Sequence, residues 1–86
     1  MKRRKLLARL ASGAVRNVGF DDFNGLVKTF GFVLVRKSGS HHIYTRPDIP
    51  QLVNLQDVNG EAKPYRARQF LRLVEKYNLT MEEERE

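Results

Sequence analysis

The sequence predicts a small α+β domain in which two helices cover one face of an antiparallel sheet. Two segments show the 3.6-residue apolar period of amphipathic helices, one starting near Asp21 and one near Pro64. Three short runs rich in β-branched and aromatic residues lie between them, separated by glycine, proline and asparagine turn signals. The order helix, three strands, helix therefore predicts a two-layer sandwich.

The helices are predicted from the spacing of their apolar residues. The first runs from Asp21 or Asp22, as N-cap, to a stop at Gly31, with apolar residues at i, i+3, i+4 and i+7: Phe23, Leu26, Val27 and Phe30. The last begins at about Pro64, since proline is accepted in a first turn, and has one apolar face: Ala67, Phe70, Leu71, Val74 and Tyr77. Residues 2–11 allow an optional short helix in front.

The predicted strands span residues 32–37, 41–46 and 51–57, and the turn Ser38-Gly39-Ser40 joins the first two into a hairpin. Side chains alternate across a strand, so neighbours in the second strand point to opposite faces. If Ile43 packs under the helices, the other face is open to solvent and carries His42, Tyr44 and Arg46. His41 then lies on the covered side with Ile43.

Composition narrows the class of protein. The 86 residues suffice for one domain, and the absence of cysteine excludes a disulfide framework and a thiolate zinc site. No apolar run approaches the roughly 20 residues of a membrane-spanning helix, and the basic start is followed by too short an apolar stretch for a signal peptide. A reducing cytoplasm is the expected compartment.

The net charge of +6 is concentrated near the start of the chain. Residues 1–19 form a basic extension without an acidic residue, residues 20–79 form the domain, and residues 80–86 form an acidic tail that we expect to be disordered. Such a distribution favours polyanionic partners, nucleic acid before membrane. The alternative is a solvated arm that merely keeps the protein soluble.

Motifs for most catalytic chemistry are absent from the sequence. It contains no H-E-x-x-H motif, no acidic cluster spaced for Mg²⁺ or Ca²⁺, no G-x-S-x-G elbow and no Walker or Rossmann glycine loop. We therefore expect no metal and no cofactor, and His42 remains the one candidate for a titrating catalyst. A lone histidine on a strand is more often structural or a plain binding contact.

A resemblance to a known family favours a catalytic role for His42. The segment from Gly31 to Leu79 resembles the HicA (YcfA-like) family of toxin endoribonucleases from type II toxin-antitoxin systems, and the similarity extends back to about Phe20. It is carried by Gly31-Phe32, by Gly39-Ser40-His41-His42-Ile43-Tyr44 and by Ala62-Lys63-Pro64-Tyr65. The sequence departs from the shortest members by its basic extension and by Leu52-Val53-Asn54-Leu55, which leaves substrate choice and partner contacts open.

The resemblance implies a fold, an activity and a partner. Family members have a double-stranded-RNA-binding-domain-like fold and cleave mRNA, which blocks translation, and a HicB-type antitoxin inhibits them. The histidine that ends their G-S-x-H tetrad is catalytic, and this position is His42 here. The resemblance therefore implies a cytoplasmic mRNA interferase whose antitoxin covers the His42 face.

RNA can be cut without a metal if a base takes the 2′-OH proton and cations stabilise charge on the phosphate. Imidazole, with an ordinary pKa near 6.5, suits the base role, which we assign to His42. The cation is left open between Lys37, Arg36 and Arg46. Gly39 and Ser40 would bring the turn close to the phosphate, while Tyr44 would either stack on an unpaired base or pack across the strands.

Two rival functions remain at this point. A non-catalytic RNA-binding module could use the same fold, because fold does not fix function. A protein-interaction domain could use the basic extension to meet an acidic partner. The G-S-x-H tetrad at the hairpin favours the ribonuclease over both, with single-stranded mRNA as the expected substrate.

Overall fold

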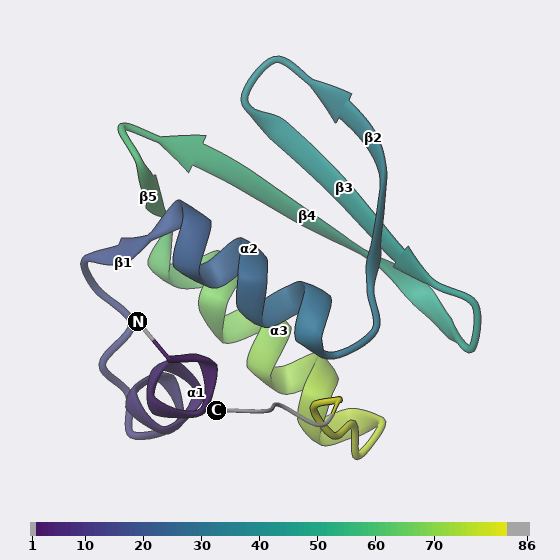
Figure 1. The fold of residues 1–86 in the computed structure, drawn as a ribbon, viewed down its shortest axis with the longest axis horizontal. Helices are drawn as coiled ribbons and strands as arrows, with labels where there is room; N and C mark the ends of the chain where they lie inside the picture. The colour runs from purple at the N-terminus through teal and green to yellow at the C-terminus, as the bar shows by residue number, and fades with distance from the viewer. Residues whose placement is uncertain (1, 83–86) are drawn as a thin grey trace.

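The computed structural model describes residues 2–82, and within them it contains three helices and five strands (Figure 1). The helices are α1 (Arg3–Ala11), α2 (Phe20–Thr29) and α3 (Pro64–Lys76). The strands are β1 (Val18–Gly19), β2 (Val33–Ser38), β3 (His41–Arg46), β4 (Ile49–Val58) and β5 (Glu61–Ala62). The predicted α+β class and its two main helices are confirmed.

The sheet has the order β1-β5-β4-β3-β2, and every neighbouring pair is antiparallel. The three predicted strands are present, but the sheet has five strands among the described residues. Strands β1 and β5 contain two residues each, too few to show the alternation that predicts a strand. Strand β4 begins before Pro50, where we expected a break, because proline is tolerated where its missing N–H faces an unpaired edge.

Both α2 and α3 lie against one face of the sheet (Figure 1). Phe70 of α3 stands at the centre of the core and makes edge-on ring contacts with three other phenylalanines, at centroid distances of 5.4 to 5.9 Å: Phe23, Phe30 and Phe32. These contacts join α3 to α2 and to the chain entering β2. The core thus holds the two layers together.

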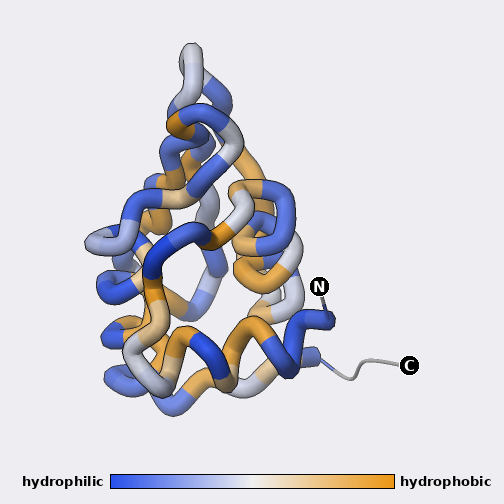
Figure 2. The backbone as a smooth tube through the Cα atoms, turned by 90° about the vertical axis from the view of Figure 1, so that its left-hand side faces the viewer, coloured by the Kyte–Doolittle hydropathy of each residue, from blue (hydrophilic) through white to orange (hydrophobic). Residues whose placement is uncertain are grey.

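The basic extension is part of this core. Leu6 and Leu10 of α1 are about 1% exposed and pack against α2 and α3, and Val15 and Val18 are also buried. Figure 2 shows apolar and polar residues alternating along α1, as an amphipathic helix requires. The apolar face of α1 therefore closes the core, and the division at residue 19 stays a prediction.

The start of the acidic tail is also ordered against the domain. The Glu82 amide donates a hydrogen bond to the Thr29 carbonyl oxygen at 2.7 Å, and Met81 packs on the core. Met81 and Glu82 thus contact the domain, while the division at residue 80 stays a prediction. Residues 83–86 lie outside the described part of the chain.

The alternation expected in β3 is correct, but the assignment of its two faces is wrong. Tyr44 is fully buried, and its cross-strand partner Val53 in β4 is buried beside it. The face that carries His42, Tyr44 and Arg46 therefore lies under the helices, while His41 and Ile43 lie on the open face. The larger aromatic side chain takes the core position, because its hydroxyl finds a partner on α2.

No helix within residues 2–82 is long and apolar enough to cross a membrane. The longest, α3, has 13 residues, and its polar side carries arginines.

The burial of α1 leads to a first prediction. Leu10→Ala should lower the free energy of unfolding by about 2–5 kcal/mol, since it removes a fully buried side chain and leaves a cavity. Leu7→Ala, on the same helix but only partly buried, should cost less. Urea denaturation of both variants measures the difference, and equal small losses would show that α1 does not belong to the core.

Candidate active site

The site forms around a two-residue hairpin turn between β2 and β3. Ser38 pairs with His41, so Gly39 and Ser40 are the two central residues. Gly39 has a φ of +58°, whereas Ser40 is not among the residues with positive φ, as in a type II′ turn. Glycine at the first central position is what this turn needs, and the turn fixes the direction of the Ser40 carbonyl group.

That carbonyl oxygen orients His42. It accepts a hydrogen bond from the Asp57 amide of β4 at 3.0 Å, and the Nδ1 atom of His42 lies 3.2 Å from it. A carbonyl oxygen can only accept, so Nδ1 must carry the proton in this bond. A neutral His42 then keeps the lone pair on Nε2, which is the form a general base needs.

The imidazole ring is also held by packing. Its centroid lies 4.8 Å from that of Phe20, at an interplanar angle of 55°. Phe20 is the first residue of α2 and is itself buried, and Leu55, the cross-strand partner of His42 in β4, is 1% exposed. His42 is half-buried between these groups, so its ring has a defined position at the edge of the core.

A bulge in β2 decides which cation lies across from His42. The pairing changes register between Leu34 and Arg36, so that Lys37 is opposite His42 and Arg36 is opposite Ile43. Directly opposite side chains share a face of the sheet. With uninterrupted pairing, Arg36 would take the place of Lys37. The structure therefore brings Lys37 to His42 and puts Arg36 on the open face.

Arg46, the third candidate cation, lies at the other end of β3, about 13 Å along the strand from His42. Its Nη1 atom donates to the Phe30 carbonyl oxygen at 2.8 Å, and its Nε atom pairs with Asp48 at 2.8 Å. Arg46 thus satisfies a carbonyl at the C-terminal end of α2. It is not brought together with His42.

Tyr44 has no exposed surface with which to stack on a base. Its hydroxyl donates a hydrogen bond to the Asn24 side-chain oxygen on α2, and burial raises the pKa of Tyr44 above its ordinary value. His41, on the open face, has its Nδ1 atom 3.1 Å from Oδ1 of Asn54. The two adjacent histidines are thus held on opposite faces by different partners.

Sequence reasoning missed two features of the site. Phe20 is the residue on which His42 packs, and nothing in the sequence distinguishes it from any other apolar residue at a helix start. The second is the carbonyl group of Ser40, which orients His42, whereas the sequence indicated only that Ser40 lies in a turn near the phosphate. The Ser40 hydroxyl is exposed and lies 3.5 Å from the Gln56 amide nitrogen, at the limit of a hydrogen bond.

Among residues 2–82, no three side chains of His, Cys, Asp or Glu gather where they could hold a metal ion.

The fold and the hairpin together define a small, basic α+β domain with one candidate catalytic histidine. Residues 20–75, more than half of the chain, match the family described as HicA toxin of bacterial toxin-antitoxin systems. The chain therefore belongs to the HicA toxin family, and the family implies a cognate antitoxin. No curated protein and no solved structure gives a match. The matched region contains β2, β3 and the hairpin, while α1 and β1 precede it.

Burial of Tyr44 leads to a second prediction, on alkaline stability. Because its folded-state pKa lies above the ordinary value of 10.0, the unfolded chain loses this proton first as the pH rises. The stabilising effect is thus complete below pH 10 and is lost above it. Tyr44→Phe should make the free energy of unfolding fall less steeply above pH 10, at a cost of about 1 kcal/mol at neutral pH for the lost hydrogen bond.

Tyr65→Phe is the matched control, since Tyr65 is exposed on α3. Chemical denaturation at neutral pH and at several values above pH 10 compares the two variants with the parent chain. An unchanged alkaline slope in Tyr44→Phe would contradict the assignment.

Proposed function

We propose that this chain is an endoribonuclease toxin that cleaves mRNA and blocks translation, with His42 as general base and without a catalytic metal. The observation that supports the proposal most directly is the contact between Nδ1 of His42 and the Ser40 carbonyl oxygen, because it leaves Nε2 as the basic nitrogen. Membership of the HicA toxin family supports the toxin role. The histidine stands at the end of the G-S-x-H tetrad of this sequence.

RNA carries its own nucleophile, which limits what the protein must supply. Nε2 of His42 takes the proton of the 2′-OH, and the 2′-oxygen attacks the adjacent phosphorus. The bond from phosphorus to the 5′-oxygen breaks, and the leaving oxygen takes a proton from water. The hydroxide ion that remains takes the proton from Nε2 of His42, which restores the base. The products are a 2′,3′-cyclic phosphate and a 5′-OH end. General base catalysis of this kind contributes about 10²- to 10⁴-fold.

Lys37 is the cation best placed to stabilise charge on the phosphate. It is exposed, lies directly across from His42, and carries a point charge on a flexible stem. Gly39 and Ser40 form the turn beside it, where a phosphate can approach the backbone closely because Gly39 has no side chain. Arg36 and Tyr44 point elsewhere, so we assign them no role in the reaction.

Single-stranded mRNA is the proposed substrate. The 2′-OH must align with the phosphorus and the leaving oxygen, and a single strand reaches this geometry more easily than an A-form helix does. The cognate antitoxin would inhibit by covering the hairpin end. We place this cover at the turn and at the His42 edge of the helix layer, since the open face of the sheet does not carry His42.

The third prediction tests the base. His42→Ala should lose about 10²- to 10⁴-fold in the rate of cleavage of a defined single-stranded RNA in chelator-containing buffer. His41→Ala should cleave at nearly the parent rate, since His41 lies on the other face. Circular dichroism checks that the variants are folded, and analysis of the product ends tests for the cyclic phosphate.

If the parent chain binds RNA but leaves it intact, the function is that of a non-catalytic RNA-binding module. If it does neither at moderate salt, the chain is a protein-interaction domain. Loss of cleavage in both histidine variants would show that the hairpin as a whole, and not one imidazole, is required.

The fourth prediction tests the cation. Lys37→Ala should lower cleavage by about 10-fold, less than the 10²- to 10³-fold typical of a buried donor, because Lys37 is exposed. Arg36→Ala removes the same charge from the next residue, on the opposite face, and should change cleavage by less than about 3-fold. Single-turnover rates at one ionic strength give the comparison, and equal effects would indicate non-specific electrostatics.

A further inference from the structure

Strand β4 has an unpaired edge. On one side it pairs with β3 from Ile49 to Gln56, but on the other side, within residues 2–82, it pairs only at Asp57 and Val58, with β5. The edge from residue 50 to residue 56 therefore has no neighbouring strand. Its length, about 20 Å at 3.3 Å per residue, equals that of a typical strand.

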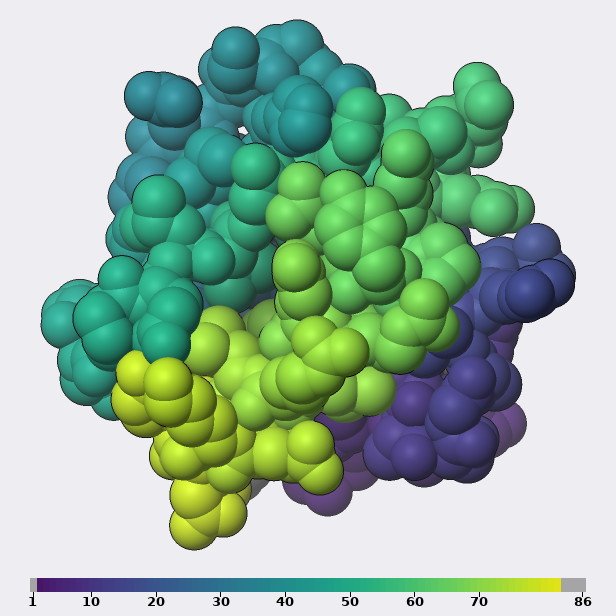
Figure 3. Space-filling model, turned by 180° about the vertical axis from the view of Figure 1, so that it is seen from behind, coloured from purple at the N-terminus to yellow at the C-terminus, as the bar shows by residue number. Residues whose placement is uncertain are grey.

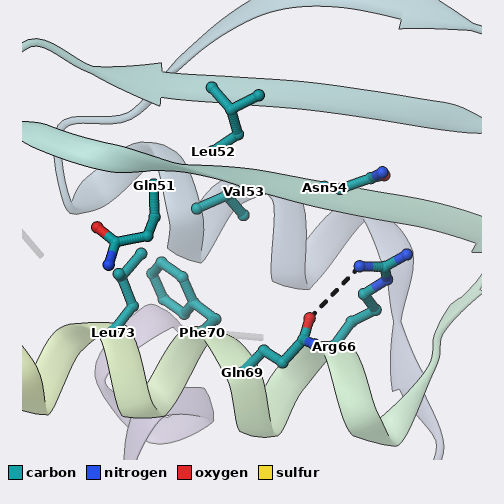
Figure 4. Close-up of a pocket in the computed structure, with 8 residues that line it drawn as sticks. All are labelled: Gln51, Leu52, Val53, Asn54, Arg66, Gln69, Phe70 and Leu73. Carbon is teal, nitrogen blue, oxygen red and sulfur yellow. Dashed lines mark hydrogen bonds between the residues drawn. The ribbon is translucent and has the colours of Figure 1, made fainter.

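A groove runs along this edge, between β4 and α3. Residues 51–54 line one side, and four side chains of α3 rise from the other: Arg66, Gln69, Phe70 and Leu73 (Figure 4). Figure 3 shows the face of the molecule on which α3 and β4 meet. The cavity volume of about 260 Å³ is below the range of roughly 300–1,000 Å³ typical of small-molecule sites, but it can receive side chains of a peptide.

Arg66 is incompletely satisfied in this groove. Its Nε atom is buried and has no hydrogen-bond partner in residues 2–82, its Nη1 atom makes a long contact of 3.4 Å with Gln69, and its guanidinium carbon lies 4.8 Å from the centroid of the Tyr65 ring. Buried donors are normally paired, so an unpaired one at a groove is compatible with an acceptor supplied by a bound partner. Leu52, on the rim, is 62% exposed. The groove therefore offers main-chain groups, an apolar rim and one unpaired cationic donor.

These features fit one kind of occupant. An extended peptide can pair with an open sheet edge through its backbone and place alternate side chains into a groove. A carboxylate on that peptide would accept from Arg66. A second copy of this chain would bring another basic chain of net charge +6, and RNA would find a single arginine beside apolar side chains where phosphates need several cations.

We propose that the cognate antitoxin anchors on this toxin by adding an extended acidic segment to the free edge of β4, over Arg66. The inference rests on the proposed toxin function, because it takes the antitoxin as the partner. The anchor lies beside β4 and His42 lies on β3, so the added strand is two strand spacings, about 10 Å, from the strand that carries the base. Binding and covering of the active site are thus done by different parts of the antitoxin.

The experiment uses the intact cognate antitoxin, with the full toxin chain carrying His42→Ala so that it can be expressed safely. Hydrogen exchange of the free chain and of the complex should show new protection of amides between residues 51 and 54. Arg66→Glu in this background should weaken antitoxin binding by about 30-fold or more, since it reverses one partner of a charge pair. Glutamate in the first turn of α3 suits the helix dipole, so this variant should remain folded.

Arg72→Glu is the matched control. It changes the charge of the same helix by the same amount at an exposed position outside the groove, and binding should change by less than about 3-fold. Leu52→Glu replaces an exposed apolar side chain on the rim of the groove, so it should weaken antitoxin binding without affecting the fold. Isothermal titration gives the dissociation constants.

Several outcomes would overturn the proposal. Protection confined to β2 would place the antitoxin on the opposite edge of the sheet. Equal losses in Arg66→Glu and Arg72→Glu would indicate general charge attraction. If the free chain is a dimer and these amides are already protected, the edge belongs to an interface with a second copy. If a single-stranded RNA oligonucleotide alone protects these amides, the edge binds nucleic acid. The RNA cleavage assay of the active chain is independent, so failure of the nuclease proposal would be recognised separately.

Discussion

The packing of Phe70 is the contact on which the rest of this small structure depends. Its ring meets three phenylalanines, from α2, from the loop after α2 and from the entrance to β2. A domain of this size has one modest core, and aromatic pairs add directional preference to the burial of area. Because α3 is fixed by this residue, the helix layer has a defined position under the sheet, and Phe20 at the start of α2 can reach His42.

At the candidate site, a backbone carbonyl group orients the histidine, a role that a side chain has in many catalytic centres. Catalytic histidines are commonly oriented by a carboxylate, whereas here a carbonyl of the hairpin turn is the partner of Nδ1. That carbonyl is itself fixed by the Asp57 amide of the neighbouring strand. The orientation of the imidazole is therefore a property of the sheet, and it requires no additional buried charge.

Much of this arrangement could be predicted from the sequence. The periodicity of α2 and α3 and the turn signals around Gly39 were sufficient for the class, for three strands and for the position of His42 at a hairpin. The sequence could not decide which face of β3 is covered, because Ile43 and Tyr44 are both credible core residues. In the structure, Tyr44 has a hydrogen-bond partner on α2, Asn24, and a buried partner across the sheet, Val53.

The sequence also could not decide which of the three candidate cations, Lys37, Arg36 or Arg46, lies beside His42. A bulge of one residue in β2 exchanges Arg36 and Lys37 between faces, and no local signal in Val33-Leu34-Val35 marks it. The short strands β1 and β5 were missed because two residues carry no period. The burial of α1 was not predicted, because residues 1–19 contain six cations and such a charge favours a solvated segment. The two leucines that the structure buries, Leu6 and Leu10, are outnumbered by these charges.

The position of α3 also has a consequence for synthesis of the chain. Helix α1 is synthesised before α2 and α3, yet its apolar face packs on both of them, and Phe70 lies in α3. A nascent chain that lacks residues 64–76 has no centre for its core, so it cannot hold the hairpin against the helix layer. The folded domain, and with it any toxic activity, can arise only after residues 64–76 have left the ribosome.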